Sequence, residues 1–247
     1  GYNYSVDWGD GNTSTGQTGD ALHTYSSAGT YTVRITGTFP RIYFNNGGDR
    51  RKILTIQQWG TGSWASMDRA FYGASNLTIP ATDAPDLTGV TSLSMMFTGA
   101  TSFNSSINHW NVSSITNMSG LFSGASSFNQ PLNSWNVSNV TNMQAMFQSA
   151  EQFNQPLGSW DVSNVLSMIN MLNFGLSTVN YDDTLIGWSA LPLQNNVTFD
   201  AGTSTYCNAS TERANIISTH SWTINDAGSA VCYTPNDFVT TWKTDNP

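Results

Sequence analysis

The chain has 247 residues, and a hydrophobic content of 38% with 12% aromatics is enough for a substantial core. Only 10% of the residues are charged and the net charge is −8, so neutral hydrogen-bonding side chains must cover most of the surface. The eight basic residues all lie at or before Arg69 or at or after Arg213. Because binding to phosphate groups depends on Lys and Arg, this distribution argues against nucleic acid and anionic membrane as partners.

The sequence has no run of about 18 apolar residues, so we expect no insertion into a bilayer. It begins at Gly1 with neither Met nor a signal peptide, and we expect the chain to be processed or excerpted from a longer protein. The hydrophobic content excludes a disordered tail.

Residues 1–46 are predicted to form a β-domain. The segment Val6-Asp-Trp-Gly-Asp-Gly11 contains a tight turn, and Tyr31-Thr-Val33-Arg-Ile35 alternates like a strand. Together with His23-Thr-Tyr25, these motifs resemble the polycystic-kidney-disease (PKD) domain, which is an immunoglobulin-like β-sandwich. A complete sandwich needs roughly 80 to 100 residues, so the resemblance implies a partial one.

A 25-residue repeat dominates the middle of the chain. Trp110, Trp135 and Trp160 recur at this interval, and so do Phe97, Phe122 and Phe147. Stacking of successive copies would place each of these residues on its counterpart and bury both sets in one continuous core. We therefore assign the Met and aromatic positions to the core rather than to a cofactor site.

Each copy is predicted to contain one short strand and one short helix. Trp135-Asn-Val137 alternates like a strand, whereas Met143, Met146 and Phe147 have the i, i+3, i+4 spacing of a helical turn. We assign residues 47–206 to a solenoid of such repeats. The expected fold class is thus mixed: a partial PKD-like β-sandwich followed by an α/β leucine-rich-repeat-type solenoid with a C-terminal cap.

The repeat unit itself has a familiar form. The stretch Phe128-Asn-Gln-Pro-Leu-Asn-Ser-Trp-Asn-Val-Ser-Asn-Val-Thr-Asn-Met143 closely resembles the BspA-like leucine-rich-repeat family of bacterial surface proteins. The resemblance covers roughly residues 55 to 228. It implies a secreted or surface-anchored protein, often an adhesin or host-protein binder, with no enzymatic activity.

Residues 207–232 are predicted to cap the solenoid, with Ser210 or Thr211 as helix N-cap, Glu212 in the first turn and a Trp222-Thr-Ile224 strand. Cys207 and Cys232 bracket this cap and lack the close pairing and His partners of a zinc site. We expect them to form a disulfide, which would indicate an oxidising compartment.

Residues 233–247 look like the segment that precedes the next β-domain in flavobacterial members of the family. The chain then resembles one period of a tandem array. We hypothesise that residues 233–247 supply a strand to the β-domain of a following copy, so that the protein associates end to end.

Oxygen-rich segments suggest two sites that we do not favour. Asp7, Asp10 and Asn12 have the short spacing of calcium ligands, but the loop has no Glu at its twelfth position and turns without a metal. Asp182 and Asp183 could form a pair of catalytic carboxylates, yet adjacent acids on a surface loop are usually solvated. We predict no catalytic, cofactor or metal site.

Other motifs also have structural interpretations. His23 is expected to pack in the β-domain, and His109 and His220 lie in no catalytic motif. Gly47-Gly48 lacks the Gly-Lys-Ser or Gly-Lys-Thr ending of a phosphate loop and is expected to be a hinge, with Arg50, Arg51 and Lys52 in solvent. Glycosylation sequons occur at the repeat and flanking positions Asn104, Asn111, Asn136, Asn139 and Asn196. The repeated Asn104, Asn129 and Asn154 are expected to bond to backbone between copies.

These observations favour a non-enzymatic bacterial cell-surface adhesin or stalk module, without a cofactor, whose repeat surface contacts a protein or glycan ligand. We expect it outside the cell or on the outer surface of a bacterium of the Bacteroidota. The alternative is a structural subunit of an extracellular filament assembled end to end. A third class, the accessory part of a carbohydrate-active enzyme, lacks a credible acid/base pair.

Overall fold

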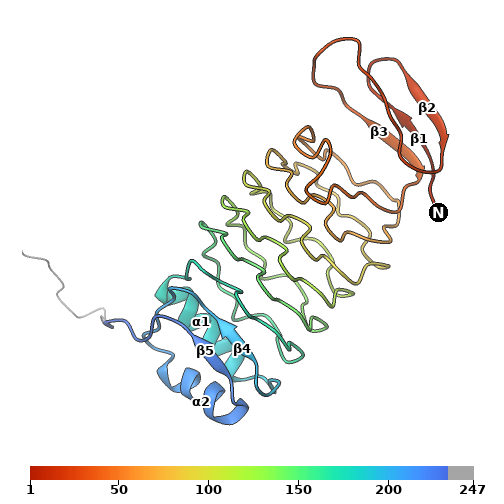
Figure 1. Cartoon of the computed structure of the whole chain (residues 1–247). Helices are drawn as coiled ribbons and strands as arrows, with labels where there is room; N and C mark the ends of the chain where they lie inside the picture. The colour runs from red at the N-terminus through yellow and green to blue at the C-terminus, as the bar shows by residue number, and fades with distance from the viewer. Residues whose placement is uncertain (233–247) are drawn as a thin grey trace, which may run out of the picture.

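The computed structural model describes residues 1–232, and the predicted strand within residues 233–247 lies outside the described residues. The molecule is elongated (Figure 1). A small β-sheet lies at its N-terminal end, two helices lie at its C-terminal end, and the repeats are stacked between them.

The N-terminal sheet has three antiparallel strands in the order β2-β1-β3: β1 Asn3–Asp7, β2 Thr13–Gln17 and β3 Arg34–Thr38. Its central strand contributes the buried Tyr4 and Val6, which are 5% and 2% exposed. All five residues of β3 are exposed. The predicted immunoglobulin-like β-sandwich is therefore wrong, because residues 1–46 provide one sheet with two open edges and no second sheet to cover it.

Three regular 25-residue layers, 93–117, 118–142 and 143–167, are stacked along the long axis. Isolated parallel bridges join Asn117 to Asn142 and Asn142 to Ser167, so equivalent positions of successive layers lie side by side. Alternate backbone N–H groups donate to the carbonyl 24 residues later, over 2.7–2.9 Å, from Met118, Gly120, Phe122 and Gly124. Each layer is thus held to the next by its own ladder of hydrogen bonds.

The predicted helical turns within the layers do not form. The N–H of Met146 does bond to the carbonyl of Met143 (3.2 Å), but Ala145 between them has φ 55° and ends the right-handed turn. The N–H of Phe147 then donates to Met171 in the next layer (2.9 Å). The i, i+3, i+4 spacing therefore marks side chains that share a tight turn rather than a helix.

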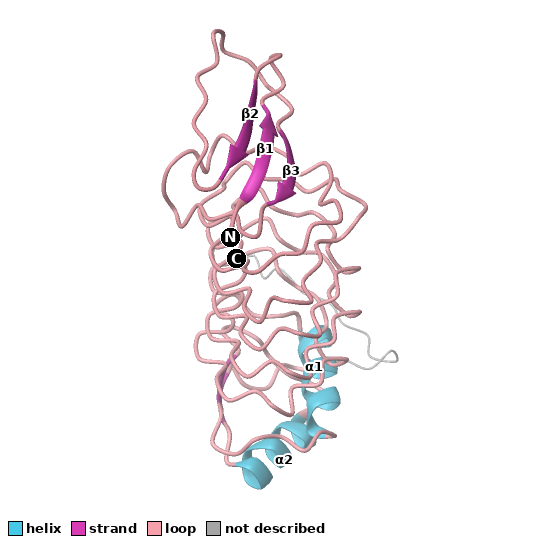
Figure 2. Cartoon of the chain, turned by 90° about the vertical axis from the view of Figure 1, so that its right-hand side faces the viewer, coloured by secondary structure: helices cyan, strands magenta, loops and turns pink. Residues whose placement is uncertain are grey.

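The expected α/β leucine-rich-repeat-type solenoid is consequently wrong. Trp135-Asn-Val137 is not a strand, and residues 93–167 contain only turns, bends and isolated bridges. Within the described part of the chain, both helices follow residue 177. Figure 2 shows the middle of the molecule almost entirely as loops and turns.

The prediction that the aromatic ladders form the core is confirmed. Phe122 stacks between Phe97 and Phe147 at centroid distances of 5.8 and 5.6 Å with nearly parallel rings. A second column runs through Phe103, Phe128 and Phe153. Each such pair contributes about 0.5–1.5 kcal/mol beyond its buried area.

The tryptophans add directional bonds to this packing. Trp135 and Trp160 are 4% and 1% exposed, and each indole N–H donates to a backbone carbonyl of the preceding layer over 3.0 Å. Trp188 repeats this contact with the carbonyl of Leu157. The period therefore satisfies the buried indole donor from Trp135 onward, whereas the buried Nε1 of Trp110 in layer 93–117 has no partner within residues 1–232.

The C-terminal end contains α1 Thr178–Ser189, β4 Thr198–Asp200, α2 Ser210–His220 and β5 Thr223–Asn225. β4 and β5 pair in parallel, and the cores of both helices join the apolar cluster of the layers. The helix and strand predicted between residues 207 and 232 are present, whereas α1 was not predicted. No helix within residues 1–232 is long and apolar enough to cross a membrane.

Replacing Ser149 with Gly is expected to stabilise the protein by about 1 kcal/mol, because a left-handed conformation strains residues that carry a Cβ. Ser149 is exposed and has φ 57°, and Gly124 has φ 68° at the same position of the preceding layer. Urea denaturation would measure the change. The control is Ser127→Gly, also exposed but outside the left-handed region, which should lower stability by about 0.5–1 kcal/mol. Equal shifts in the two variants would contradict this account.

Candidate binding surfaces

The loop of Asp7, Asp10 and Asn12, which we do not favour as a calcium site, uses its oxygens to hold the turn together. Asp7 Oδ1 accepts the N–H of Gly9, and Asp10 Oδ1 accepts the N–H of Asn12, each over 3.0 Å. Asp10 Oδ2 lies 2.8 Å from His23 Nε2. No group of three or more His, Cys, Asp or Glu side chains within residues 1–232 is arranged to hold a metal ion.

His23 occupies the packing position that the sequence predicts. Its ring stacks on Trp8 at a centroid distance of 4.9 Å and meets Tyr25 edge-on at 4.6 Å. Burial disfavours the neighbouring Asp10 carboxylate, but the hydrogen bonds from His23 and Asn12 outweigh that effect and lower the pKa of Asp10 to about 2. This cluster therefore holds the first turn of the β-domain in place.

Asp182 and Asp183 lie on α1 rather than on a solvated loop, and they have different environments. Asp182 is 6% exposed and accepts the N–H groups of Cys207, Asn208 and Ala209 over 2.9–3.1 Å. Asp183 is exposed and accepts the N–H of Gly158. The two carboxylates do not form a catalytic pair, because each is engaged by backbone donors of a different segment.

The N-terminus of α2 explains the position of Asp182. The N-cap of this helix is Ala209, not Ser210 or Thr211, and it makes no side-chain capping bond. The Asp182 carboxylate, 27 residues earlier in the chain, instead accepts the N–H of Ala209, and its charge lies at the positive end of the helix dipole. No local sequence signal indicates this contact, because the donors and the acceptor lie 25 to 27 residues apart.

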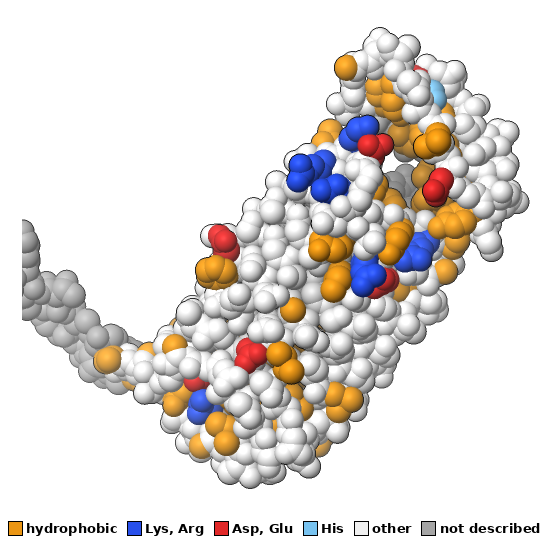
Figure 3. Space-filling model, in the orientation of Figure 1, with side chains coloured by type: hydrophobic (Ala, Val, Ile, Leu, Met, Phe, Trp, Pro, Cys, Tyr) orange, Lys and Arg blue, Asp and Glu red, His pale blue; other side chains and the backbone are white. Residues whose placement is uncertain are grey.

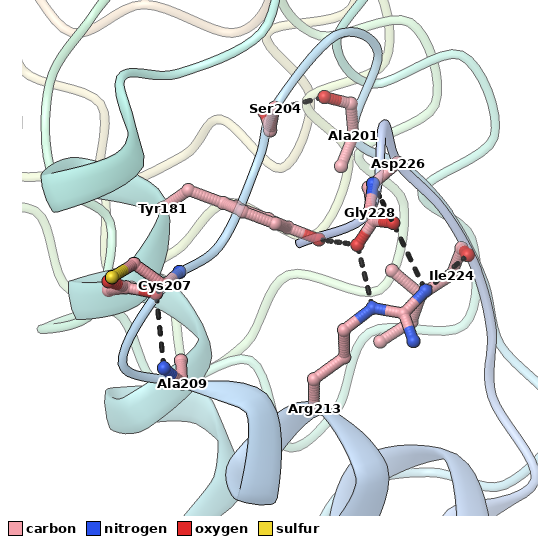
Figure 4. Close-up of polar contacts among 10 residues, drawn as sticks. Tyr181, Ala201, Ser204, Cys207, Ala209, Arg213, Ile224, Asp226 and Gly228 are labelled. Atoms are coloured by element: carbon pink, nitrogen blue, oxygen red, sulfur yellow. Dashed lines mark hydrogen bonds and ion pairs between the residues drawn. The ribbon is translucent and has the colours of Figure 1, made fainter. Parts of the chain in front are cut away.

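A second buried network joins both helices to the end of β5 (Figure 4). Asp226, whose side chain is 2% exposed, accepts the Tyr181 hydroxyl and the Nε of Arg213, both over 2.7 Å. Burial and the hydrogen bond to Asp226 raise the pKa of Tyr181 far above its usual range. The hydrogen bond to Asp226 also raises the pKa of Arg213. Every group of this network is paired internally, so we interpret it as structural.

The predicted disulfide between Cys207 and Cys232 is present. The disulfide begins at Cys207, three residues before α2, and the two cysteines, 25 residues apart in sequence, enclose α2 and β5. The disulfide and the Asp182 carboxylate therefore both hold the segment that leads into α2. In a chain-entropy estimate, closing a loop of this length stabilises the fold by roughly 3.5 kcal/mol.

The repeated asparagines bond between layers as predicted. The amide oxygen of Asn104 accepts the N–H of Asn129, and that of Asn129 accepts the N–H of Asn154, each over 2.9 Å. Asn154 continues the series by accepting the N–H of Ser177 over 2.8 Å. The asparagines therefore satisfy backbone donors at the turns between layers.

One shallow groove lies beside the repeated asparagine turns, and we call it the asparagine groove. It is lined by Ser106, Asn108, His109, Trp110, Asn111, Val112, Ser134 and Asn136. Much of its polar lining is already used internally: Asn108 Nδ2 donates to Asn133 Oδ1 over 3.0 Å, and Asn111 Oδ1 accepts the hydroxyl of Ser113.

His220 ends α2 at the other end of the molecule, so the three histidines do not converge.

A second groove, the glycine groove, crosses several layers. It is lined by the small and polar residues Asn46, Tyr72, Gly73, Ser75, Thr98, Gly99, Thr101, Ser123, Gly124 and Ser149, and by Arg50 and Arg51. Arg51 and Lys52 are exposed as predicted, but Arg50 is half-buried rather than free in solvent. Figure 3 shows a mainly neutral face with basic side chains gathered toward the N-terminal half.

Comparison with known proteins concerns the middle of the chain. Residues 65–184 match a family of unknown function. The family is described as "Mycoplasma protein of unknown function, DUF285". The match spans slightly less than half of the chain and contains the three regular layers and the first part of α1. No curated protein and no solved structure matches the chain.

Replacing Asp182 with Asn is expected to destabilise the C-terminal end by about 2 kcal/mol, because the amide removes the charge and one acceptor from three backbone donors. Urea denaturation, with hydrogen exchange at the Ala209 amide, would measure this loss. Asp183→Asn is the matched control on the same helix, and its exposed side chain should cost only about 0.5 kcal/mol. If the two variants behave alike, Asp182 does not act as the remote cap of α2.

Proposed function

We propose that the chain is a non-enzymatic module of a bacterial surface protein of the BspA-like type, which binds a protein or glycan ligand through its repeat surface. Support comes from the family match over residues 65–184 and from the repeat motif that includes Phe128–Met143. The buried carboxylates of Asp182 and Asp226 are engaged in structural hydrogen bonds, which also favours binding over catalysis.

The observation that carries this proposal is the repetition of equivalent polar groups, most of them neutral, from layer to layer. Asn111, Asn136 and Asp161 each accept the N–H and the hydroxyl of the serine two residues later. Thr116 and Thr141 form another repeated column, in which each hydroxyl donates to the backbone carbonyl of the threonine 25 residues earlier. A linear ligand would meet equivalent groups at each layer, so weak contacts would add to a useful affinity.

An extracellular location, in a bacterium of the Bacteroidota, belongs to the same proposal. The Cys207–Cys232 disulfide supports it, because such bonds form and persist mainly in oxidising compartments. The low content of charged residues, with neutral side chains over most of the surface, is also common in extracellular bacterial repeat proteins.

The purified chain should remain monodisperse in size-exclusion chromatography and bind individual members of a glycan and host-protein array saturably. Monomeric binding is expected because the layers present complete surfaces without a second copy. An array without any saturable signal for the folded chain would contradict the proposal. Hydrolysis of a polysaccharide by the chain alone would instead revive the enzyme hypothesis.

A structural role in an end-to-end filament is the second candidate, and the open edge strand β3 favours it. All five β3 residues are exposed, including Ile35 at 41%. An unpaired, partly apolar edge is a template for strand addition. The strand hypothesised within residues 233–247 remains a prediction, as those residues lie outside the described part of the chain.

A filament subunit should polymerise without a ligand, and Ile35→Lys should abolish its polymers because charge on an edge strand opposes strand addition. Electron microscopy would show this. Leu22→Lys is the matched control: Leu22 is 93% exposed and lies outside the three strands. Polymers that resist Ile35→Lys, or a chain that never polymerises, would argue against assembly through β3.

A further inference from the structure

We propose that the glycine groove binds an acidic oligosaccharide, with its carboxylate or sulfate at Arg50 and Arg51 and its neutral sugars along the glycine column. This inference rests on the proposed function as a binding module and names the chemical class of the ligand. The groove is open to solvent and has a volume of about 530 Å³, which lies within the range of about 300–1,000 Å³ for small-ligand sites.

The cationic end of the groove has donors that the protein does not use. No hydrogen bond or ion pair within residues 1–232 involves the side chain of Arg50 or Arg51. The Nε of Arg50 is buried, so the donors open to a ligand are the terminal Nη groups of the two arginines. By contrast, Lys52 pairs with Asp49 over 2.8 Å and Arg213 with Asp226 over 2.7 Å. Two adjacent guanidinium groups without internal acceptors match an anion, since guanidinium binds carboxylate and sulfate oxygens through paired N–H donors.

Gly73, which precedes the three regular layers, leaves room for the side chain of Arg50 at the cationic end of the groove. Gly73 has φ 77°, and a Cβ there would collide with Asn46 Oδ1 and with the Nε and Cδ of Arg50. The side chain of Arg50 therefore lies directly against the start of the column. Tyr72, the preceding residue, lines the same end and offers an aromatic face.

The rest of the groove suits a neutral, hydrogen-bonding chain. A Cβ on Gly124 would lie 3.6 Å from the Cα of Gly99, so the floor consists of backbone stacked layer on layer. From Gly73 to Ser149 the column spans three layer steps, or about 14 Å at the spacing of paired strands.

The walls of the groove decide between a sugar chain and a peptide. None of the twelve lining residues is acidic, and the walls beyond the arginines carry the hydroxyl oxygens of Thr98, Thr101 and Ser123. The Thr98 and Thr101 hydroxyls donate to the backbone carbonyls of Gly120 and Ser75, so they offer a ligand acceptor oxygens rather than donors. A peptide would need apolar or charged recesses for its side chains. A sugar chain carries hydroxyl donors along its length, and the acceptor oxygens of these walls match them.

The test measures binding of the full chain to an oligogalacturonate and to a heparin-derived oligosaccharide, with a neutral cello-oligosaccharide of equal length as reference. Isothermal titration calorimetry should show at least one acidic probe binding more tightly than the neutral one. Arg51→Gln should weaken that binding by about tenfold, because an exposed charge-assisted pair is lost without disturbance of the core. Arg50→Gln should weaken it at least as much.

Lys52→Gln is the matched control. It removes the same charge from the neighbouring residue, which is exposed and does not line the groove, and it should change the affinity by less than about twofold. Equal losses for Arg51→Gln and Lys52→Gln would show non-specific attraction and overturn the proposal. Equal affinity for an oligoglutamate peptide would also overturn it, in favour of a peptide ligand.

The result also separates this inference from the proposed function. If a ligand found on the array binds Arg51→Gln as tightly as the unchanged chain, the groove assignment fails while the binding role stands. If the folded chain binds no ligand on any surface, both fail.

Discussion

The register between successive layers is the constraint on which the rest of the structure depends. Because alternate N–H groups donate to the carbonyl 24 residues later, every side chain is placed beside its counterpart in the next layer. A phenylalanine must then stack on a phenylalanine, as Phe122 does between Phe97 and Phe147. The asparagine ladder through Asn129 follows from the same register. A repeat of another length would separate these partners.

The same register explains how much of the fold could be predicted. The period, the buried aromatic columns and the bonding of the asparagines follow from the sequence, because each depends only on equivalent positions being adjacent. The helical turns could not be excluded this way, since the spacing of Met143, Met146 and Phe147 fits a helix and a tight turn equally well. The left-handed backbone at Ala145 is what makes this segment a tight turn instead of a helix. An alanine in the sequence does not indicate a left-handed conformation.

The ends of the stack were harder to predict, because they depend on contacts that do not repeat. Asp182 was expected on a solvated loop, yet it caps α2 through the N–H of Ala209, 27 residues later in the chain. Asp182 reaches this position because residues Thr178–Ser189 form α1. The repeat pattern weakens before this helix, so it could not predict the contact. The pairing of Cys207 with Cys232 was predictable because the chain contains only two cysteines. Unique contacts of this kind hold the C-terminal end of the stack, where the described part of the chain provides no further layer to cover it.

Charge and repetition together determine where such a molecule can be selective. Within the layers, each polar group recurs in the next layer. A ligand shifted by one layer would therefore contact similar groups. Selectivity for position therefore needs a feature that does not recur. Arg50 and Arg51 are such a feature, since no Lys or Arg occurs between Arg69 and Arg213. The glycine groove combines both properties, because a repeated floor provides length and a single cationic end fixes the direction in which a chain can lie.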